Sequence, residues 1–171
     1  PLVSSSAASD VYKRQIANNI RVTSIPGPSS IVSSLQLSGL PISEFAFFGF
    51  VPKSKKKMED LVKNISGETR TCVFFVSSSR LIVFLDCLEN IMAERSIAIC
   101  KELTKLNEFV FRGTSSNVKN KILEDKENIK GEFVAVIDRQ TLKNHDFDEI
   151  DLYKKELKKM AKKFSLTDIV E

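Results

Sequence analysis

A glutamate flanked by lysines follows a short apolar segment in the second half of the chain. In the sequence KELTK, Glu102 lies directly after Lys101 and three residues before Lys105. The preceding residues 95–100 are typical of a strand, and α/β enzymes place functional side chains where strands end. A carboxylate or amine at such a position could act in general acid–base catalysis. On spacing alone, a surface cluster of nearly neutral ion pairs is the better explanation.

The stretch IPGPSS, residues 25–30, combines a rigid turn with two hydroxyl side chains. Gly27 permits a tight turn after an apolar segment, and Pro28 sets φ where a helix begins. Ser29 and Ser30 add hydroxyls beside the unpaired amides of the first helical turn, which can hold a carboxylate or a phosphate. A serine-capped turn without any ligand explains the same residues.

Two lysine-rich segments could follow the phosphates of a nucleic acid. One is KSKKK, residues 53–57, and the other runs from Lys154 to Lys163. The formal net charge of +4 suits an anionic partner, although many unrelated proteins carry as much. Lysine runs more often form solvated faces, and no aromatic residues alternate with these lysines to suggest base stacking.

The cysteine and histidine content argues against a metal site and against disulfides. The three cysteines Cys72, Cys87 and Cys100 lie in apolar segments without C-x-x-C spacing, so we expect reduced, buried thiols and a cytoplasmic protein. The single histidine, His145, lies in an acidic segment and cannot complete a zinc site. No apolar run approaches the ~18 residues of a membrane-spanning helix.

The segments that must position these residues predict an α/β domain. Short apolar strands alternate with helical segments, which favours a mixed sheet of five or six strands flanked by helices. We expect Gly49 to mark a bulge or a close approach, and the strand at 69–76, apolar on both faces, to lie inside the sheet. The expected strands are residues 21–25, 45–52, 69–76, 95–100, 108–113 and 131–137. The expected helices are residues 29–39, 57–65, one capped by serines 77–79, and one capped by residues 114–116 and ending near 124.

Five motifs in order resemble one family. They are IPGPSS, SGLP at 38–41, FGFVPKSK at 48–55, KELTK at 101–105 and KGEFV at 130–134. Together they resemble the ribosomal RNA small-subunit methyltransferase I branch of the tetrapyrrole methylase superfamily. The resemblance implies an S-adenosylmethionine-dependent enzyme that methylates the 2′-hydroxyl of a cytidine in the 16S rRNA of the small ribosomal subunit. It also implies a homodimer of two-domain chains that hold the cofactor between the domains.

The resemblance covers only the second of those domains. Residues 16–138 match it, followed by an expected linker at 139–150 and a truncated helical extension at 151–171. Residues 1–15 show neither strand alternation nor an apolar helical face, and we interpret them as a non-native junction after a remnant, PLVS, of the first domain.

The resemblance also implies roles for individual residues, with no metal. Glu102 and Lys105 are the catalytic candidates, because a base near the ribose hydroxyl would help methyl transfer. The cofactor candidates are Pro26, Gly27, Ser29, Ser30, Phe75, Val76, Leu103 and Thr104. The RNA candidates are Lys53, Lys55, Lys56, Lys57, Arg80 and Lys101.

One loop departs from the family pattern. Where the branch usually reads Phe-Tyr-Glu-Ser-Pro-His-Arg, this chain reads FFVSSSR at 74–80, so Val76 replaces the acid and Ser79 the histidine. Arg80 is retained, and it could hold a phosphate or merely begin a solvated helix. Two alternatives stay open: a corrin-precursor methyltransferase, which the lysine tracts disfavour, and a non-catalytic RNA-binding or dimerisation module.

Overall fold

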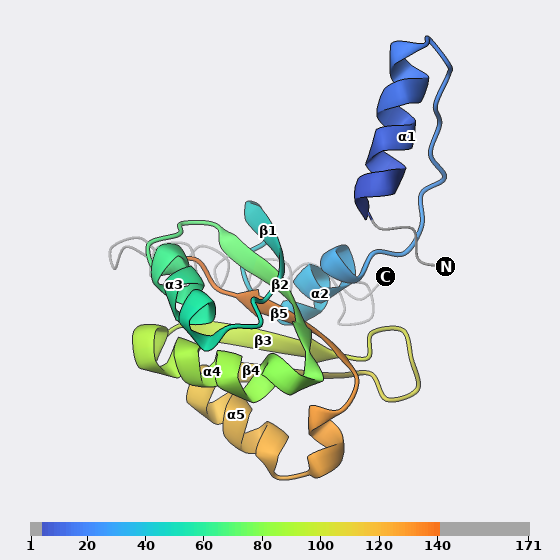
Figure 1. Ribbon diagram of the computed structural model, residues 1–171. Helices are drawn as coiled ribbons and strands as arrows, with labels where there is room; N and C mark the ends of the chain where they lie inside the picture. The colour runs from blue at the N-terminus through green and yellow to red at the C-terminus, as the bar shows by residue number, and fades with distance from the viewer. Residues whose placement is uncertain (1–4, 141–171) are drawn as a thin grey trace, which may run out of the picture.

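The computed structural model describes residues 5–140, which form a five-stranded mixed sheet in the strand order β1-β2-β5-β3-β4 (Figure 1). Strand β1 runs parallel to β2, and the other neighbours are antiparallel. The strands are β1 (Phe45–Phe50), β2 (Thr71–Ser77), β3 (Ser96–Lys101), β4 (Phe109–Thr114) and β5 (Glu132–Ile137). The helices are α1 (Ser5–Ala17), α2 (Ser30–Ser38), α3 (Lys55–Ile65), α4 (Ser78–Met92), α5 (Ser115–Leu123) and the short 3-10 helix η1 (Lys126–Ile129).

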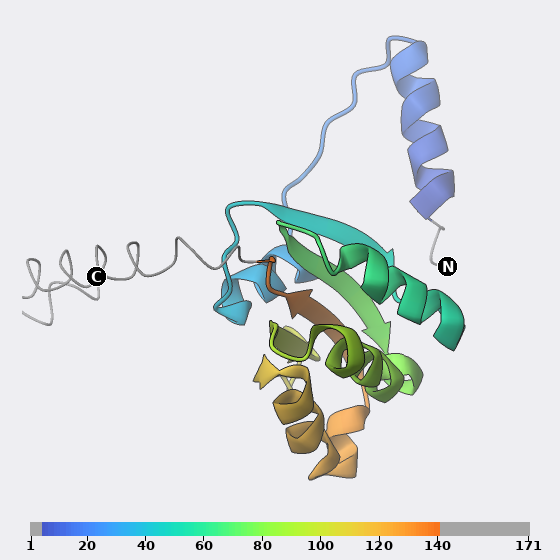
Figure 2. The same cartoon turned by 90° about the vertical axis from the view of Figure 1, so that its left-hand side faces the viewer.

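The two faces of the sheet are covered unequally. Helices α3, α4 and α5 pack on one face and enclose the larger core, in which Phe74, Phe84 and Leu85 are fully buried. Among the helices of residues 5–140, only α2 lies on the other face, over a smaller cluster around Leu35 and Val73 (Figures 1 and 2). On this face, Phe47 and Phe50 of β1 contact Phe75 and are 42% and 68% exposed.

Most elements expected from the sequence are present. Strand β2 lies inside the sheet, Gly39 ends α2 in the left-handed conformation, and the Thr114 hydroxyl caps α5 by accepting from the Asn117 amide. The bulge at Gly49 is also confirmed, because the register shifts between Phe47 and Phe50. The cysteines Cys72, Cys87 and Cys100 are unpaired and buried, as expected.

Several expectations are wrong. Residues 21–25 form no strand, because they run outside the sheet, where no neighbouring strand completes their backbone hydrogen bonds, and Ile25 is 94% exposed. The sheet therefore has five strands. Residues 5–17, for which no element was expected, form helix α1, which stands away from the sheet in both views (Figures 1 and 2).

One finer prediction also fails. The serines at the start of α4 do not cap it, since the N-cap residue Ser77 makes no capping hydrogen bond with its side chain. Strand β5, the last in the sequence, lies at the centre of the sheet, between β2 and β3. A central position lets β5 bury both faces, which explains why residues 133–137 are all buried.

The topology gathers the predicted functional segments at one edge of the sheet. Because β1 and β2 are parallel, both end there, and β3 ends beside the start of β5, with Lys101 opposite Phe133. Ser77 at the end of β2 is paired with Glu132 at the start of β5. Four predicted segments therefore meet at this edge, although the first and the last are about 80 residues apart in the sequence. They are KSKKK, FFVSSSR, KELTK and KGEFV.

Candidate functional site

A pocket of about 450 Å³ opens at this edge, on the α2 face of the sheet. Its volume is within the range of about 300–1,000 Å³ typical of small-molecule sites. Four cofactor candidates line it: Ser30, Phe75, Val76 and Leu103. The remaining lining residues are Phe50, Ser77, Ser78, Cys100, Gly131, Glu132, Phe133 and Val134. The structure thus joins residues from α2, β1, β2, α4, β3, β5 and the loop after β3.

The other four cofactor candidates do not line this pocket. Pro26 and Gly27 lie in the exposed segment between α1 and α2, and a Cβ on Gly27 would contact nothing within 4 Å. Ser29 is the N-cap residue of α2, but its hydroxyl makes no capping hydrogen bond. Thr104 is exposed in the loop after β3, where its amide donates to Glu108 Oε2 at 2.6 Å. Their roles stay predictions.

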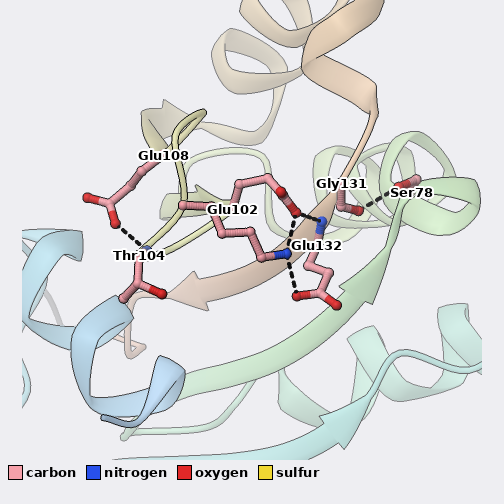
Figure 3. A network of polar contacts seen from close by, with 7 residues as sticks. Ser78, Glu102, Thr104, Glu108, Gly131 and Glu132 are labelled. Atoms are coloured by element: carbon pink, nitrogen blue, oxygen red, sulfur yellow. Dashed lines mark hydrogen bonds and ion pairs between the residues drawn. The ribbon is translucent and has the colours of Figure 1, made fainter.

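Glu102 does not line this pocket, but it holds together two segments that do, at Leu103 and Glu132 (Figure 3). Its Oε1 accepts hydrogen bonds from the Glu132 amide at 2.7 Å and from Lys105 Nζ at 3.1 Å. Lys105 Nζ also lies 3.0 Å from Glu132 Oε2, so one ammonium bridges two carboxylates. In addition, the Glu102 amide donates to the Glu132 carbonyl at 2.9 Å. These contacts fasten the loop after β3 to the start of β5.

The neighbouring Gly131 completes this network from the other side. Its carbonyl accepts a hydrogen bond from Ser78 Oγ at 2.6 Å, which links the first turn of α4 to the start of β5 (Figure 3). Gly131 has a φ of 110°, a conformation that side chains rarely adopt. Glu102 and Thr104 also have positive φ, 49° and 66°, and strained non-glycine residues of this kind cluster at functional sites.

The contacts within this network make both Glu102 and Lys105 poor general bases. The hydrogen bond from the Glu132 amide, with help from Lys105, lowers the pKa of Glu102, so its carboxylate accepts a proton less readily. The hydrogen bonds to Glu132 and Glu102 raise the pKa of Lys105, which keeps its ammonium protonated near neutral pH. The catalytic role of both residues stays a prediction, and this geometry favours a positioning role.

Three of the RNA candidates contact other groups of the protein, and these contacts differ in strength and burial. Lys101 is 7% exposed, and its ammonium donates to the Glu127 carbonyl at 2.6 Å inside the protein, so we leave it out of the candidate RNA surface. Arg80 is half-buried and donates to the Val51 carbonyl at 2.7 Å, which holds the loop after β1 against α4. Lys55 is exposed and lies 3.9 Å from Glu59, a pair of little energetic weight.

The lysine run forms an exposed basic surface beside the pocket. Lys53 lies in the loop after β1, and the other lysines occupy the first turn of α3. Met58, Val62 and Ile65 are buried on the opposite face of the same helix. We call the basic surface the lysine ridge; its residues are Lys53, Lys55, Lys56 and Lys57.

Sequence reasoning missed several residues of this site. Ser78 was expected only as one of the serines that cap a helix, yet its hydroxyl bonds to Gly131. Gly131 and Glu132 were read as the start of a strand, although the KGEFV motif contained the signal. Phe50 was not singled out, because in sequence it is one phenylalanine of four in β1.

The pocket fits an S-adenosylmethionine-type ligand in its chemistry. Its apolar side chains on the α2 face, such as Phe75 and Leu103, suit an adenine ring or a thioether chain. Ser30 in the first turn of α2 brings a hydroxyl and the positive end of a helix, which suit the carboxylate of an amino acid. Burial raises the pKa of Cys100, at the pocket wall, to about 11, so this thiol is an apolar lining group and no nucleophile.

Within residues 5–140, no three histidine, cysteine, aspartate or glutamate side chains gather as metal ligands would. In the same range, no helix has the length and apolar character needed to cross a bilayer. Residues 141–150 of the expected linker, which include His145, lie outside the described residues, as does the expected helical extension at 151–171 with its lysine-rich segment at 154–163.

The sequence matches proteins of one group. Residues 1–119 match the model of the tetrapyrrole (corrin/porphyrin) methylases. The chain is 37% identical over 122 residues to the ribosomal RNA small subunit methyltransferase I of Xylella fastidiosa, which is 71% of this chain and 45% of that protein. It is 43% identical over 96 residues to the protein of the same name from Mycobacterium bovis, 56% of this chain and 34% of that one. The chain thus spans less than half the length of these relatives.

Solved structures agree in fold. The uroporphyrin-III-C-methyltransferase of Thermus thermophilus superposes with a TM-score of 0.53 at 16% identity, over 81% of this chain and 60% of that one. A cobalt precorrin-4 methyltransferase superposes with a TM-score of 0.51 at 14% identity, over 78% of this chain and 59% of that one. The mixed sheet with helices on both faces is therefore shared with tetrapyrrole methyltransferases. The match over residues 1–119 shows that the chain belongs to the tetrapyrrole (corrin/porphyrin) methylase family.

Proposed function

We propose that this chain is part of an S-adenosylmethionine-dependent enzyme that methylates the ribose 2′-hydroxyl of a cytidine in 16S rRNA. The observation that carries the proposal is the pocket in which Ser30, Phe75 and Leu103 meet, next to the exposed lysine ridge. A small-molecule pocket and a cationic surface at one sheet edge are what a methyltransferase acting on an RNA backbone needs. The relatives' names supply the ribosomal RNA substrate.

When bound, S-adenosylmethionine would supply an activated methyl group on a sulfonium, so the protein's main task is alignment. The lysine ridge would hold RNA phosphates, and the contacts among Glu102, Lys105 and Glu132 would fix the loop that borders the pocket. The proton of the ribose hydroxyl would leave to solvent water during transfer. Because Lys105 is protonated and Glu102 is a weakened base, we assign both to positioning within this proposal.

The proposal includes two features of the whole protein. The first concerns the region that the relatives have and this chain does not span: we infer that this region supplies the remaining cofactor contacts. The second is a homodimer, working in the cytoplasm on the small ribosomal subunit. Sedimentation of the chain, alone and joined to the unmatched part of a relative, would test the dimer.

The first experiment measures cofactor binding and methyl transfer in a matched pair of variants. Leu103 lines the pocket, whereas Leu106, in the same loop, is fully exposed. We expect Leu103→Trp to fill the pocket and reduce S-adenosylhomocysteine binding and transfer at least roughly tenfold, by overpacking. Leu106→Trp should behave as the unchanged protein. Equal binding by the two variants would rule out this pocket as the cofactor site.

Transfer is measured from labelled S-adenosylmethionine to small ribosomal subunits that lack the modification. The protein used is the chain joined to the unmatched part of the Xylella fastidiosa relative. Label on a ribose 2′-oxygen of 16S rRNA is the expected result. RNA binding without label would favour a non-catalytic RNA-binding module, for which the altered loop FFVSSSR already provides a reason. Label on a corrin precursor instead of RNA would favour the tetrapyrrole alternative.

A further inference from the structure

We propose that Phe50 is the surface on which an unpaired base of the RNA substrate stacks at the mouth of the pocket. This inference rests on the proposed function and adds to it a subsite for a nucleobase. Proteins that bind single-stranded nucleic acids combine a cationic track for the backbone with aromatic side chains for the bases. The lysine ridge alone supplies only the first component.

Phe50 is a large apolar side chain left open to solvent at the pocket. It is 68% exposed and still lines the pocket with Phe75 and Leu103. Its ring centroid lies 5.2 Å from that of Phe75 at an interplanar angle of 57°, and the Phe47 ring supports Phe75 from 4.9 Å. A ring held against other rings is a preorganised stacking partner, because binding then costs little further side-chain entropy.

The bulge in β1 directs Phe50 toward the pocket. Side chains of a regular strand alternate, so Phe48 and Phe50 would share one face. Phe48, which is 38% exposed, stacks on Phe74 of the larger core, on the face opposite to α2, at 5.0 Å between centroids. Because β1 carries one extra residue between Phe47 and Phe50, Phe50 instead pairs with Phe75 on the α2 face. Gly49, with φ 76°, provides the conformation that this bulge requires.

The charges that follow Phe50 identify the ligand as a nucleic acid. The four exposed lysines of the lysine ridge occupy residues 53–57, immediately beyond the loop that leaves β1. Arg80 fixes that loop through its 2.7 Å bond to the Val51 carbonyl, so the ridge and Phe50 are held together. An apolar partner protein would not call for this cationic border, whereas an RNA strand would place phosphates on the lysines and a base on the ring.

The chemistry of the proposed reaction also requires such a surface. A ribose hydroxyl presented to a pocket brings its base with it, and a base removed from its stack loses a few kcal/mol of stacking. An aromatic ring at the pocket mouth recovers part of that loss without selecting one base over another. Phe50 is placed for this, since it belongs to both the pocket lining and the exposed surface.

The test uses the absence of tryptophan from the sequence. Phe50→Trp places a single fluorophore at the subsite and keeps an aromatic ring there. Phe45→Trp is the matched control, because Phe45 lies on the same strand, is 43% exposed and does not line the pocket. Both variants are titrated with a short unstructured oligocytidine and, separately, with S-adenosylhomocysteine.

We expect the oligocytidine to quench the fluorescence of Phe50→Trp and leave that of Phe45→Trp unchanged. Quenching of Phe50→Trp by S-adenosylhomocysteine alone would assign the ring to the adenine of the cofactor and overturn the inference. Absence of quenching by either ligand would overturn it as well. Equal quenching of both tryptophans by the oligocytidine would indicate unspecific contact and have the same consequence.

A second measurement separates stacking from charge. Phe50→Ala should weaken oligocytidine binding roughly 5- to 150-fold, the range for one stacked base, without changing the slope of log K against log salt. Phe50→Tyr should restore the affinity, and Phe45→Ala should leave it unchanged. Equal affinities for the unchanged chain and Phe50→Ala would overturn this inference alone. If the unchanged chain bound no RNA, the proposed function would fail together with it.

Discussion

Gly131 and Glu102 approach each other so closely that the glycine has no room for a side chain. A Cβ built on Gly131 would lie 2.7 Å from Glu102 Cγ and 2.8 Å from Glu102 Oε1. This approach lets the Glu102 carboxylate reach the Glu132 amide at 2.7 Å. The glycine of the KGEFV motif is therefore required by its proximity to the KELTK motif, which lies about 30 residues earlier in the chain.

Replacing Gly131 by alanine should destabilise the fold. The new methyl group would push the Glu102 side chain off the Glu132 amide, and φ of 110° is strained for alanine. We expect the free energy of unfolding, measured by urea denaturation, to fall by about 1–3 kcal/mol. Gly67→Ala is the control, because a Cβ there would contact nothing within 4 Å. Equal stability of the two variants would contradict the close approach described above.

Glu102 should make the stability of the protein depend on pH in the acidic range. Hydrogen bonds from the Glu132 amide and Lys105 hold the pKa of Glu102 below its ordinary value of 4.5. The folded state thus prefers the ionised carboxylate, so its stabilisation is complete above pH 4.5 and disappears as the pH falls through the lowered pKa. The melting temperature of Glu102→Gln should therefore decline less than that of the unchanged chain as the pH is lowered from above 4.5 into the acidic range.

Other carboxylates contribute to acid unfolding in both proteins. The Arg70 guanidinium, for example, lowers the pKa of Glu68 to about 2. Only the difference between the two melting curves therefore reports on Glu102. Asp60→Asn, at an exposed position of α3, serves as the control and should keep the original pH dependence. Parallel melting curves for Glu102→Gln and the unchanged chain would show that the network adds no pH-dependent stability.

The lysine ridge should determine the salt dependence of RNA binding. Changing its four lysines together to alanine should weaken binding to single-stranded RNA and reduce the slope of log K against log salt by about 0.7 for each phosphate that is no longer neutralised. A variant with the same change in charge at exposed lysines elsewhere is the control. Its substituted residues are Lys13, Lys63, Lys121 and Lys126. If both quadruple variants showed the same slope, the ridge would be an ordinary solvated face.

The three thiols should be unreactive in the folded protein. Burial raises the pKa of Cys72 and of Cys100 to about 11 and raises that of Cys87, so the reactive thiolate is scarce and shielded from reagents. A disulfide-exchange reagent at neutral pH should label none of them rapidly in the native state and all three after unfolding in guanidinium. Rapid labelling of one native thiol would show that its side chain is accessible.

Local patterns in the sequence predicted the elements well where the signal was periodic or chemical. The helical spacing of Met58, Val62 and Ile65 indicated α3, and the unbroken apolar run at 69–76 indicated an interior strand. Gly49 indicated the bulge, and Thr114 indicated the cap of α5. Such signals survive folding because they express backbone conformation and the burial of one face.

The expected strand at residues 21–25 shows the limit of local patterns. The alternation of apolar and polar residues there indicates only a preference for extended backbone. A strand forms only if a neighbouring strand completes its backbone hydrogen bonds, and none of the strands β1 to β5 pairs with this segment. The central position of β5 was equally invisible, because strand order depends on packing between segments distant in sequence. Only half of the cofactor candidates, the ones at Ser30, Phe75, Val76 and Leu103, line the pocket for the same reason.

The sequence by itself determined the fold class, the resemblance to the methylase family and the exposed lysine ridge, since these depend on composition, motifs and local periodicity. Only the tertiary structure decided that Gly131 must be a glycine, that Lys101 is buried against Glu127, and that Phe50 faces the pocket. Each of these depends on the distance between atoms far apart in the sequence. Such distances are set by strand register and by the packing of the whole sheet.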